Sequence, residues 1–393
     1  VVNGAAPYAA DLTGVISGTG AAAGSGDGLV KFGNGNVRLS AANTYTGRTF
    51  VGGQGSIFLN SATAFSPNTW MHLDGGAGGT LGGILGLGYN LAADLGVTGG
   101  KVHFAASGGF AAFGGDRTVT LNGGSNLTWG STTSFVATSQ NLILGQAKAD
   151  GKITLTNGID LNESSRTIHV NDGAAVVDAE MSGVLSGDFG GIVKTGAGTL
   201  ALTGTSTYLG TTDVLAGKLL VNGALDETYT IVQSAGTLGG NGTIAGFGSI
   251  SGTLAPGQGI GSLGGGYFSF QLGSIFSYEL NSTLTTGDLL HVADLDILDG
   301  ATLAVTDLAP AVLPEGTKLT LVSYINGYNG GSFTYQGNPL PDGSSFTAGP
   351  NRWQINYDDT SGGSNFSAQQ AGATGRVTIT IVPNVSPYSD WAQ

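Results

Sequence analysis

Short segments of this chain alternate apolar with polar residues, and this alternation predicts β-strands with one face toward a core and one toward solvent. The clearest segments lie at residues 36–40, 56–60, 117–122, 152–156, 166–171, 199–203 and 218–222. Asn-Gly or Asp-Gly pairs occur beside several of them, and glycine accepts the positive φ that tight corners require. The pattern therefore predicts an all-β fold of short strands and tight corners.

One phrase occurs twice in the chain. Residues 28–35 read Gly-Leu-Val-Lys-Phe-Gly-Asn-Gly, residues 191–198 read Gly-Ile-Val-Lys-Thr-Gly-Ala-Gly, and each phrase leads to a tyrosine, Tyr45 or Tyr208. The same spacing of 163 residues separates the two tyrosines and the two opening glycines. A repeat within β-rich sequence is typical of a solenoid, in which each unit buries its apolar face on its neighbours. We expect repeat blocks at about residues 11–60 and 178–223.

The composition favours strands over helices and limits the kinds of partner that the chain can bind. The 393 residues include 72 Gly, only 10% are charged, and the net charge is −13. So acidic a chain should repel nucleic acid and anionic membranes, and no apolar run approaches the ~18 residues of a membrane span, so we expect neither nucleic-acid binding nor membrane insertion. The absence of Cys excludes disulfides and thiolate metal sites.

Residues 191–223 resemble the autotransporter-associated β-strand repeat, in which a Gly-x-x-Lys-x-Gly-x-Gly-Thr-Leu phrase leads to a Tyr-x-Gly motif. The stretches 237–242, 252–257, 260–263 and 276–305 resemble the C-terminal part of the same passenger solenoids. The resemblance implies a right-handed parallel β-helix, or β-solenoid, that a bacterium secretes or carries on its cell surface.

The amino-acid composition of the chain changes near residue 306, where Pro, Tyr and Asn become more frequent. We expect a solenoid over residues 1–305, a β-rich cap or small β-sandwich over 306–382 that covers the last coil, and a tail at 383–393. A cap of this kind shields a strand edge that would otherwise be open. We also expect that the signal peptide has already been removed and that both termini are held by the body or by a neighbouring molecule.

Several acidic and aromatic residues could carry chemistry. Asp294, Asp296 and Asp299 cluster, and two of them share one face of a strand, which suits Ca²⁺ or acid–base work; a solvated edge is the structural alternative. The pair Asp358-Asp359 is expected to form an acidic turn. Tyr45 and Tyr208 are expected to pack between coils, with stacking on a glycan as the functional alternative.

The remaining motifs favour structural roles. The four His residues are far apart in sequence and predict no metal site, and a Gly-x-Gly-x-x-Gly match fits a solenoid corner better than a nucleotide loop because no βαβ unit surrounds it. The tryptophans are scattered, but Trp391 in the tail is a candidate plug for a groove on another subunit. The residues concerned are His72, His103, His169, His291, Gly259, Gly261, Gly264, Trp70, Trp129, Trp353 and Trp391.

These observations favour an extracellular structural protein, a self-assembling subunit of a surface fibre, layer or matrix, without catalysis, cofactor or metal. Its main partner would be a second copy of itself in a homo-oligomer or head-to-tail filament, with residues 1–12 and 377–382 as candidate contacts. A cell-surface adhesin or autotransporter passenger that binds a glycan or host surface is the alternative. A polysaccharide-active β-helix enzyme is a third, more remote reading, because the chain shows no convergent carboxylates and few basic residues.

Overall fold

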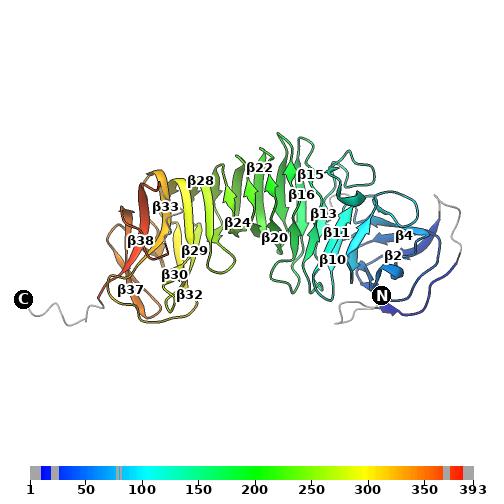
Figure 1. Cartoon of the computed structure of the whole chain (residues 1–393), viewed down its shortest axis with the longest axis horizontal. Helices are drawn as coiled ribbons and strands as arrows, with labels where there is room; N and C mark the ends of the chain where they lie inside the picture. The colour runs from blue at the N-terminus through cyan, green and yellow to red at the C-terminus, as the bar shows by residue number, and fades with distance from the viewer. Residues whose placement is uncertain (1–9, 19–25, 77–78, 80–81, 366–371, 384–393) are drawn as a thin grey trace, which may run out of the picture. The chain divides into compact units, whose positions relative to one another are not determined.

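The structure is a computed structural model that describes residues 10–18, 26–76, 79, 82–365 and 372–383. Tertiary contacts divide the chain into two units, which comprise residues 1–219 with 223–226 (unit 1) and residues 220–222 with 227–393 (unit 2). Strands dominate both units (Figure 1). In the described part, no helix has the length and apolar character needed to cross a membrane.

The main ladder of unit 1 contains one strand from each successive coil, paired in parallel. Its strands are β1 (Ala10–Leu12), β3 (Val37–Leu39), β5 (Ser56–Leu59), β7 (Ile84–Leu87), β10 (Gly108–Ala112), β13 (Leu142–Leu144), β16 (Ser165–Val170), β19 (Gly191–Thr195) and β22 (Thr211–Val221). Parallel partners in exact sequence order are what a solenoid produces, because each coil returns to the same face.

Register in this ladder places apolar residues directly above one another. Ile57 pairs with Leu85, Leu85 with Phe110, Phe110 with Leu144, and Leu144 with Val170. All five side chains are fully buried. Burying a side chain of this size contributes about 1.5–3 kcal/mol, so each coil is held mainly by the two coils beside it.

Further parallel ladders complete the coils of unit 1. One contains β2 (Asp27–Lys31), β4 (Gly47–Gly52), β6 (Thr69–Asp74) and β9 (Val102–Phe104). A second contains β8 (Leu91–Ala93), β11 (Arg117–Leu121), β14 (Ile153–Leu155), β17 (Ala179–Met181) and β20 (Thr199–Leu202). A third contains β12 (Leu127–Thr128), β15 (Ile159–Asp160) and β18 (Leu185–Ser186). The remaining short elements are η1 (Ala62–Ala64), η2 (Asn122–Gly124), β21 (Thr205–Ser206) and β23 (Ala224–Leu225).

Unit 2 repeats this architecture with two parallel ladders that share their first strand. One contains β24 (Tyr229–Gly240), β26 (Gly248–Ile250), β28 (Ser262–Phe270), β31 (Leu289–Ile297) and β33 (Lys318–Tyr328). The other continues from β24 through β27 (Thr253–Pro256), β29 (Ile275–Asn281), β32 (Thr302–Asp307) and β34 (Thr334–Tyr335). The short strands β25 (Thr243–Ile244) and β30 (Thr286–Gly287) pair with β28 and β29.

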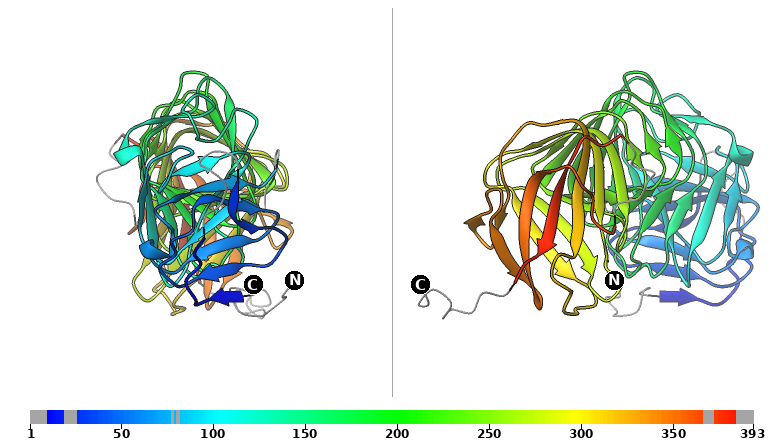
Figure 2. Two further views of the ribbon diagram at one scale, coloured as in Figure 1. Left: turned by 90° about the vertical axis from the view of Figure 1, so that its right-hand side faces the viewer. Right: turned by 60° about the vertical axis from the view of Figure 1, so that its left-hand side comes forward.

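Antiparallel strands follow the last parallel pair of unit 2. The strand β38 (Gly375–Ile381) lies between β33 and β37 (Asn351–Asp359), β37 also pairs with β36 (Ser345–Ala348), and β34 pairs with β35 (Asn338–Pro339). The right-hand view of Figure 2 shows these orange and red strands beside the yellow strands of the ladder. The sheet closes this side of the ladder because both edges of β38 are paired within the chain.

The prediction of an all-β parallel solenoid is confirmed. Each of the alternating segments forms or joins a strand, from residues 36–40 in β3 to residues 218–222 in β22. The boundary placed at residue 305 stays a prediction, since parallel pairing continues into β33 and β34 beyond it. Residues 1–9 and 384–393, with Trp391, lie outside the described residues, so the expectation that the termini are held also stays a prediction.

Candidate functional site

The repeated phrase places one lysine inside each copy. Lys194 lies in register with Ile168 and Val214, is fully buried, and its Nζ donates to the carbonyl oxygens of Thr195 (3.1 Å), Gly196 (2.9 Å) and Ala216 (2.9 Å). Burial lowers the pKa of Lys194 to about 8. Since Ala216 lies on the following coil, the lysine ties two coils together.

Lys31 has the same role in the first copy. Its side chain is buried, and its Nζ donates to the carbonyl oxygen of Gly33 and to that of Gly52 on the following coil. Burial lowers its pKa to about 8 as well. Sequence reasoning assigned no role to these lysines. The signal that could have revealed their role is a charged residue at the same place in both copies, within an apolar stretch.

Tyr45 and Tyr208 are core residues of their repeats. They are 2% and 1% exposed, and their hydroxyls bond to those of Thr49 (2.7 Å) and Thr212 (2.6 Å). Rings buried to this extent offer no face to a glycan, so the structure favours the packing role over the stacking role.

The acidic cluster Asp294, Asp296 and Asp299 accepts hydrogen bonds from neighbouring coils. Asp296 accepts from Tyr267 and Ser269, whereas Asp294 and Asp299 accept from the Asn326 side chain (3.0 Å) and the Ser332 amide (3.1 Å). Among the described residues, no three His, Cys, Asp or Glu side chains are grouped so as to hold a metal ion. The cluster therefore joins the last coils of the ladder.

Asp358 and Asp359 lie where β37 ends. Asp358 accepts a hydrogen bond from the Tyr324 hydroxyl (2.9 Å), and Asp359 accepts one from the Lys318 ammonium (2.6 Å). Burial raises the pKa of Asp359, but hydrogen bonds from Lys318, Ser361 and Thr378 outweigh it and hold the pKa at about 2. This ion pair links β33 to β37 across β38.

Two of the four histidines meet although they are distant in sequence. His72 and His103 are parallel partners on β6 and β9 with ring centroids 5.2 Å apart, and Phe50 stacks on His72 at 5.4 Å. Burial lowers the pKa of His72 to about 4, and Arg48 and His103 add to the shift. The other two, His169 and His291, bond to the hydroxyls of Thr195 and Ser323.

A surface ladder of aromatic rings was missed by sequence reasoning. Tyr229 stacks on Phe247 with centroids 4.7 Å apart, and Phe247 stacks on Tyr267 at 4.8 Å. The three rings come from successive coils of unit 2 and cover one another's faces. Their spacing matches the distance between neighbouring strands, so the ladder follows from the coil geometry.

The remaining residues singled out in the sequence, tryptophans and glycines, lie in the core, at a corner or in a strand. Trp129 and Trp353 are fully buried, and Trp70 is 6% exposed. Gly259 has a φ of 83° at a corner, whereas Gly264 lies within β28. The position of Gly259 fits the prediction of a solenoid corner, whereas Gly264 is part of a strand.

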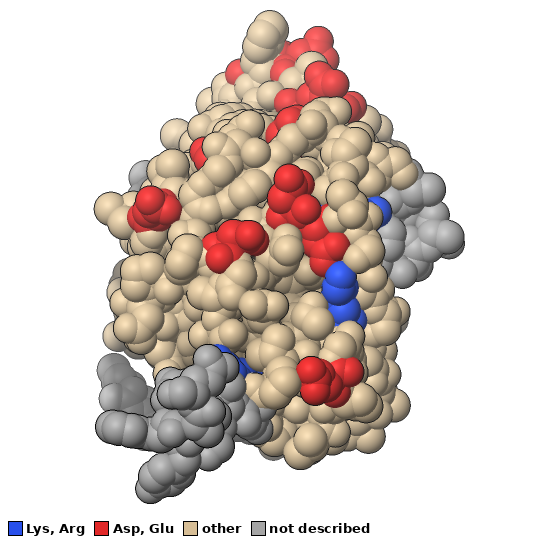
Figure 3. All heavy atoms as spheres, turned by 90° about the vertical axis from the view of Figure 1, so that its left-hand side faces the viewer, with Lys and Arg blue, Asp and Glu red and all other residues tan. Residues whose placement is uncertain are grey.

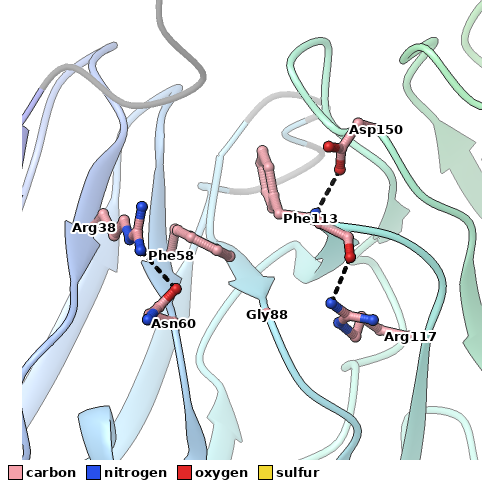
Figure 4. Close-up of a pocket in the computed structure, with 8 residues that line it drawn as sticks. Arg38, Phe58, Asn60, Gly88, Phe113, Arg117 and Asp150 are labelled. Carbon is pink, nitrogen blue, oxygen red and sulfur yellow. Dashed lines mark hydrogen bonds between the residues drawn. The ribbon is translucent and has the colours of Figure 1, made fainter.

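A cavity of about 260 Å³ opens on the outer side of unit 1 (Figure 4). Its walls come from five successive coils, and the two arginines that line it lie on opposite sides of Gly88. It is lined by Arg38, Phe58, Asn60, Gly88, Phe113, Gly114, Arg117 and Asp150. No sequence motif indicated it, because its residues span more than 100 positions.

The aromatic wall of this cavity depends on a glycine. In register, Arg38 pairs with Phe58 and Phe58 with Gly86. A Cβ at Gly86 would lie 2.8 Å from the Phe113 ring, so the missing side chain makes room for that ring over the strand. Phe58 and Phe113 consequently meet with centroids 4.8 Å apart.

Comparisons with known proteins match the repeated phrase. The model of the passenger-associated transport repeat matches residues 29–55 and 192–221. An extracellular serine protease of Serratia marcescens is 48% identical over 75 residues, which are 19% of this chain and 7% of that protein. The adhesin BmaC autotransporter of Brucella suis biovar 1 (strain 1330) is 32% identical over 109 residues, 27% of this chain and 3% of that protein. The resemblance to autotransporter passenger repeats is confirmed, and this chain corresponds to a small part of the length of these relatives.

Proposed function

We propose that this chain, which carries two passenger-associated transport repeats, belongs to a protein exported to the surface or exterior of a bacterium, where its solenoid serves as a non-catalytic structural scaffold. Two relatives support the location by their names, one an extracellular protease and one an autotransporter adhesin. Their activities belong to proteins far longer than the matched segments.

The observation that carries the scaffold role is the use of inward polar groups to join coils. The ammonium of Lys194 binds the carbonyl oxygen of Ala216 on the next coil, and the Lys31 ammonium does the same with Gly52. The Asn157 amide, fully buried, donates to the carbonyl oxygen of Leu121 one coil earlier. Groups that bond the backbone of adjacent coils resist separation of those coils, because separation would leave buried donors and acceptors unpaired.

Self-assembly into a fibre or layer remains part of the proposal, but only one of the two candidate contact segments is kept. β38, which covers most of the C-terminal candidate strand 377–382, is paired on both edges within its own chain. Residues 227–393 contain three Lys and Arg against twelve Asp and Glu, and acidic groups are widespread on the face in Figure 3. If the acidic C-terminal parts of two copies approached each other, like charges would repel. We therefore propose that copies associate through the N-terminal coil, whose strand β1 pairs with β3 on one side.

A glycan-binding adhesin is the second candidate function, and the cavity of Figure 4 favours it. The two roles are compatible, since a scaffold can carry a binding site on its outer face. An enzyme is a weaker candidate, because the carboxylates grouped in the sequence accept hydrogen bonds within the fold.

Two experiments test the proposal. An epitope inserted at the exposed turn of Gly343 should be recognised on intact cells or in the medium of the producing bacterium, and retention inside the cells would contradict export. Sedimentation and negative-stain microscopy of the purified chain should reveal assemblies that an Ala10→Pro change disperses, because proline cannot donate to a strand ladder. Monomers at every concentration would refute self-assembly, and the scaffold role would then be tested by the export experiment.

A further inference from the structure

The cavity of unit 1 concentrates a scarce kind of side chain. The chain has six arginines in 393 residues and a net charge of −13, yet two of these arginines line a single space of about 260 Å³. Sites for drug-sized ligands measure roughly 300–1,000 Å³, so this cavity suits one small ring with its substituents.

Both guanidinium groups are held in place by the protein itself. Arg117 donates from Nη1 to the carbonyl oxygen of Asp116 (2.8 Å) and from Nη2 to that of Gly114 (2.7 Å), and its Nε is buried with no hydrogen-bond partner in the described part of the chain. Arg38 donates from Nη2 to the Asn60 side chain (2.7 Å). Groups oriented before a ligand arrives lose less entropy when it binds.

The rest of the lining is partly aromatic and partly polar. The Arg38 guanidinium lies over the Phe58 ring, 5.6 Å from its centroid, and Phe113 lies beside Phe58. Asp150 stands at the opposite side, where one of its carboxylate oxygens accepts a hydrogen bond from the Gly114 amide (2.7 Å, Figure 4). The cavity thus combines cations, a carboxylate acceptor and an apolar wall.

We propose that this cavity binds a carboxylate-bearing sugar unit, a hexuronate, as a monosaccharide or as one residue of an acidic polysaccharide. The planar guanidinium groups match a carboxylate, with which arginine forms paired hydrogen bonds. The Asp150 carboxylate and the Asn60 amide bind sugar hydroxyls, and the C–H groups of the sugar contact the small part of Phe58 and Phe113 that lines the cavity, since these rings are 6% and 4% exposed. The site adds a recognition function to the scaffold and does not depend on self-assembly.

The lining distinguishes this ligand from simpler ones. An inorganic anion would use the arginines but would gain nothing from the aromatic wall, and Asp150 would repel it. A neutral sugar would use Asp150 and the wall but would bring no negative charge to Arg117, whose guanidinium in the described part of the chain bonds to the carbonyl oxygens of Asp116 and Gly114. Asp11, whose carboxylate lies 3.8 Å from Arg38 Nε, weakens the pull on any anion and makes the hydroxyl and ring contacts necessary.

The test is a titration of the complete chain with galacturonate, followed by NMR of the arginine Nε–H groups, of which the chain has six. Galacturonate has 13 non-hydrogen atoms, so we expect a dissociation constant on the order of 1 mM for the monosaccharide. The signals of Arg38 and Arg117 should shift, and that of Arg352 in unit 2 should stay. Digalacturonate at the same sugar concentration distinguishes a polymer site, which binds it more tightly, from a monosaccharide site.

Matched variants locate the site. Arg117→Gln should weaken galacturonate binding roughly 10-fold or more, because a hydrogen bond to a charged group is lost. Arg352→Gln makes the same change outside the cavity and should leave binding unchanged. Circular dichroism verifies the fold of each variant, and if Arg117→Gln fails to fold, Arg38→Gln and the signal map of the unaltered chain decide.

Three results would overturn the proposal. One is the absence of any galacturonate-dependent shift at Arg38 and Arg117 up to roughly 20 times the expected dissociation constant. Another is equal binding of galactose, which would remove the role of the carboxylate. The last is equal binding of inorganic phosphate, which would show a general anion site without sugar recognition.

Discussion

Replacing the buried lysine of the second repeat by methionine tests how the coils are joined. Lys194→Met keeps the length and most of the volume of the side chain but removes three donors to the carbonyl oxygens of Thr195, Gly196 and Ala216. At pH 7 we expect a loss of about 1–3 kcal/mol in the free energy of unfolding. Unpaired acceptors cost about that much, while relief from burying a charge offsets part of it.

The pH dependence gives a sharper signature. Burial lowers the pKa of Lys194 from 10.5 to about 8, so between these values the unfolded chain holds a proton that the folded chain has released. Lys194 should therefore make the stability of the unaltered protein rise with pH in this window, by roughly 2.5 kcal/mol between pH 7 and pH 10 for a fully buried lysine. Lys31, whose pKa burial also lowers to about 8, adds a rise of its own that Lys194→Met retains. Above about pH 10 the trend reverses, because burial raises the pKa of Tyr208 and the unfolded chain then loses its proton first.

The assay is urea unfolding followed by circular dichroism at several pH values from 7 to 10. The rise should be smaller in Lys194→Met, and the stability difference between the two proteins should grow with pH. Lys148→Met, a change at an exposed lysine of the same unit, should keep the full rise. A flat or falling profile in the unaltered protein, or the same rise in Lys194→Met, would refute the burial of a charged lysine in the repeat.

Three further predictions concern other interior and surface groups. Tyr208→Phe should lower the free energy of unfolding by about 1 kcal/mol, because it removes one buried hydrogen bond; thermal unfolding would show no change if that bond were absent. Phe247→Ala removes two stacked-ring contacts and should cost about 1–3 kcal/mol, more than Tyr229→Ala, which removes one; equal costs would contradict the ladder. Stability should fall as the pH drops from 6.5 to about 4, by roughly 1–2 kcal/mol after allowing for partial exposure of His72, because the unfolded chain takes up a proton that the folded chain excludes. His103→Gln should reduce this acid loss, and an unchanged acid profile would contradict the contact between the two imidazoles.

The fold could be predicted because its rules are local. Alternation along segments such as 117–122 sets which side chains face inward, and strands that repeat coil after coil leave parallel stacking as the arrangement that buries those faces. The repeated phrase then fixed the equivalence of Tyr45 and Tyr208, which bond to hydroxyls four residues on in both copies. Sequence did not reveal how β38 inserts between β33 and β37, because antiparallel pairing over such separations depends on competition among several similar strands.

The cavity lay beyond sequence reasoning for a different reason. Because the coils differ in length, residues that lie together in space are not separated by a regular interval in the sequence. Arg38 and Arg117 line the same cavity although 79 positions separate them. The arrangement also depends on an absence, since Phe113 reaches Phe58 only where Gly86 has no side chain. In a chain with 72 glycines, sequence cannot distinguish a glycine that makes room for a ring from one that turns a corner. A solenoid can therefore acquire a binding site by changing a single outward residue on one coil, while the inward columns that hold the coils together stay as they are.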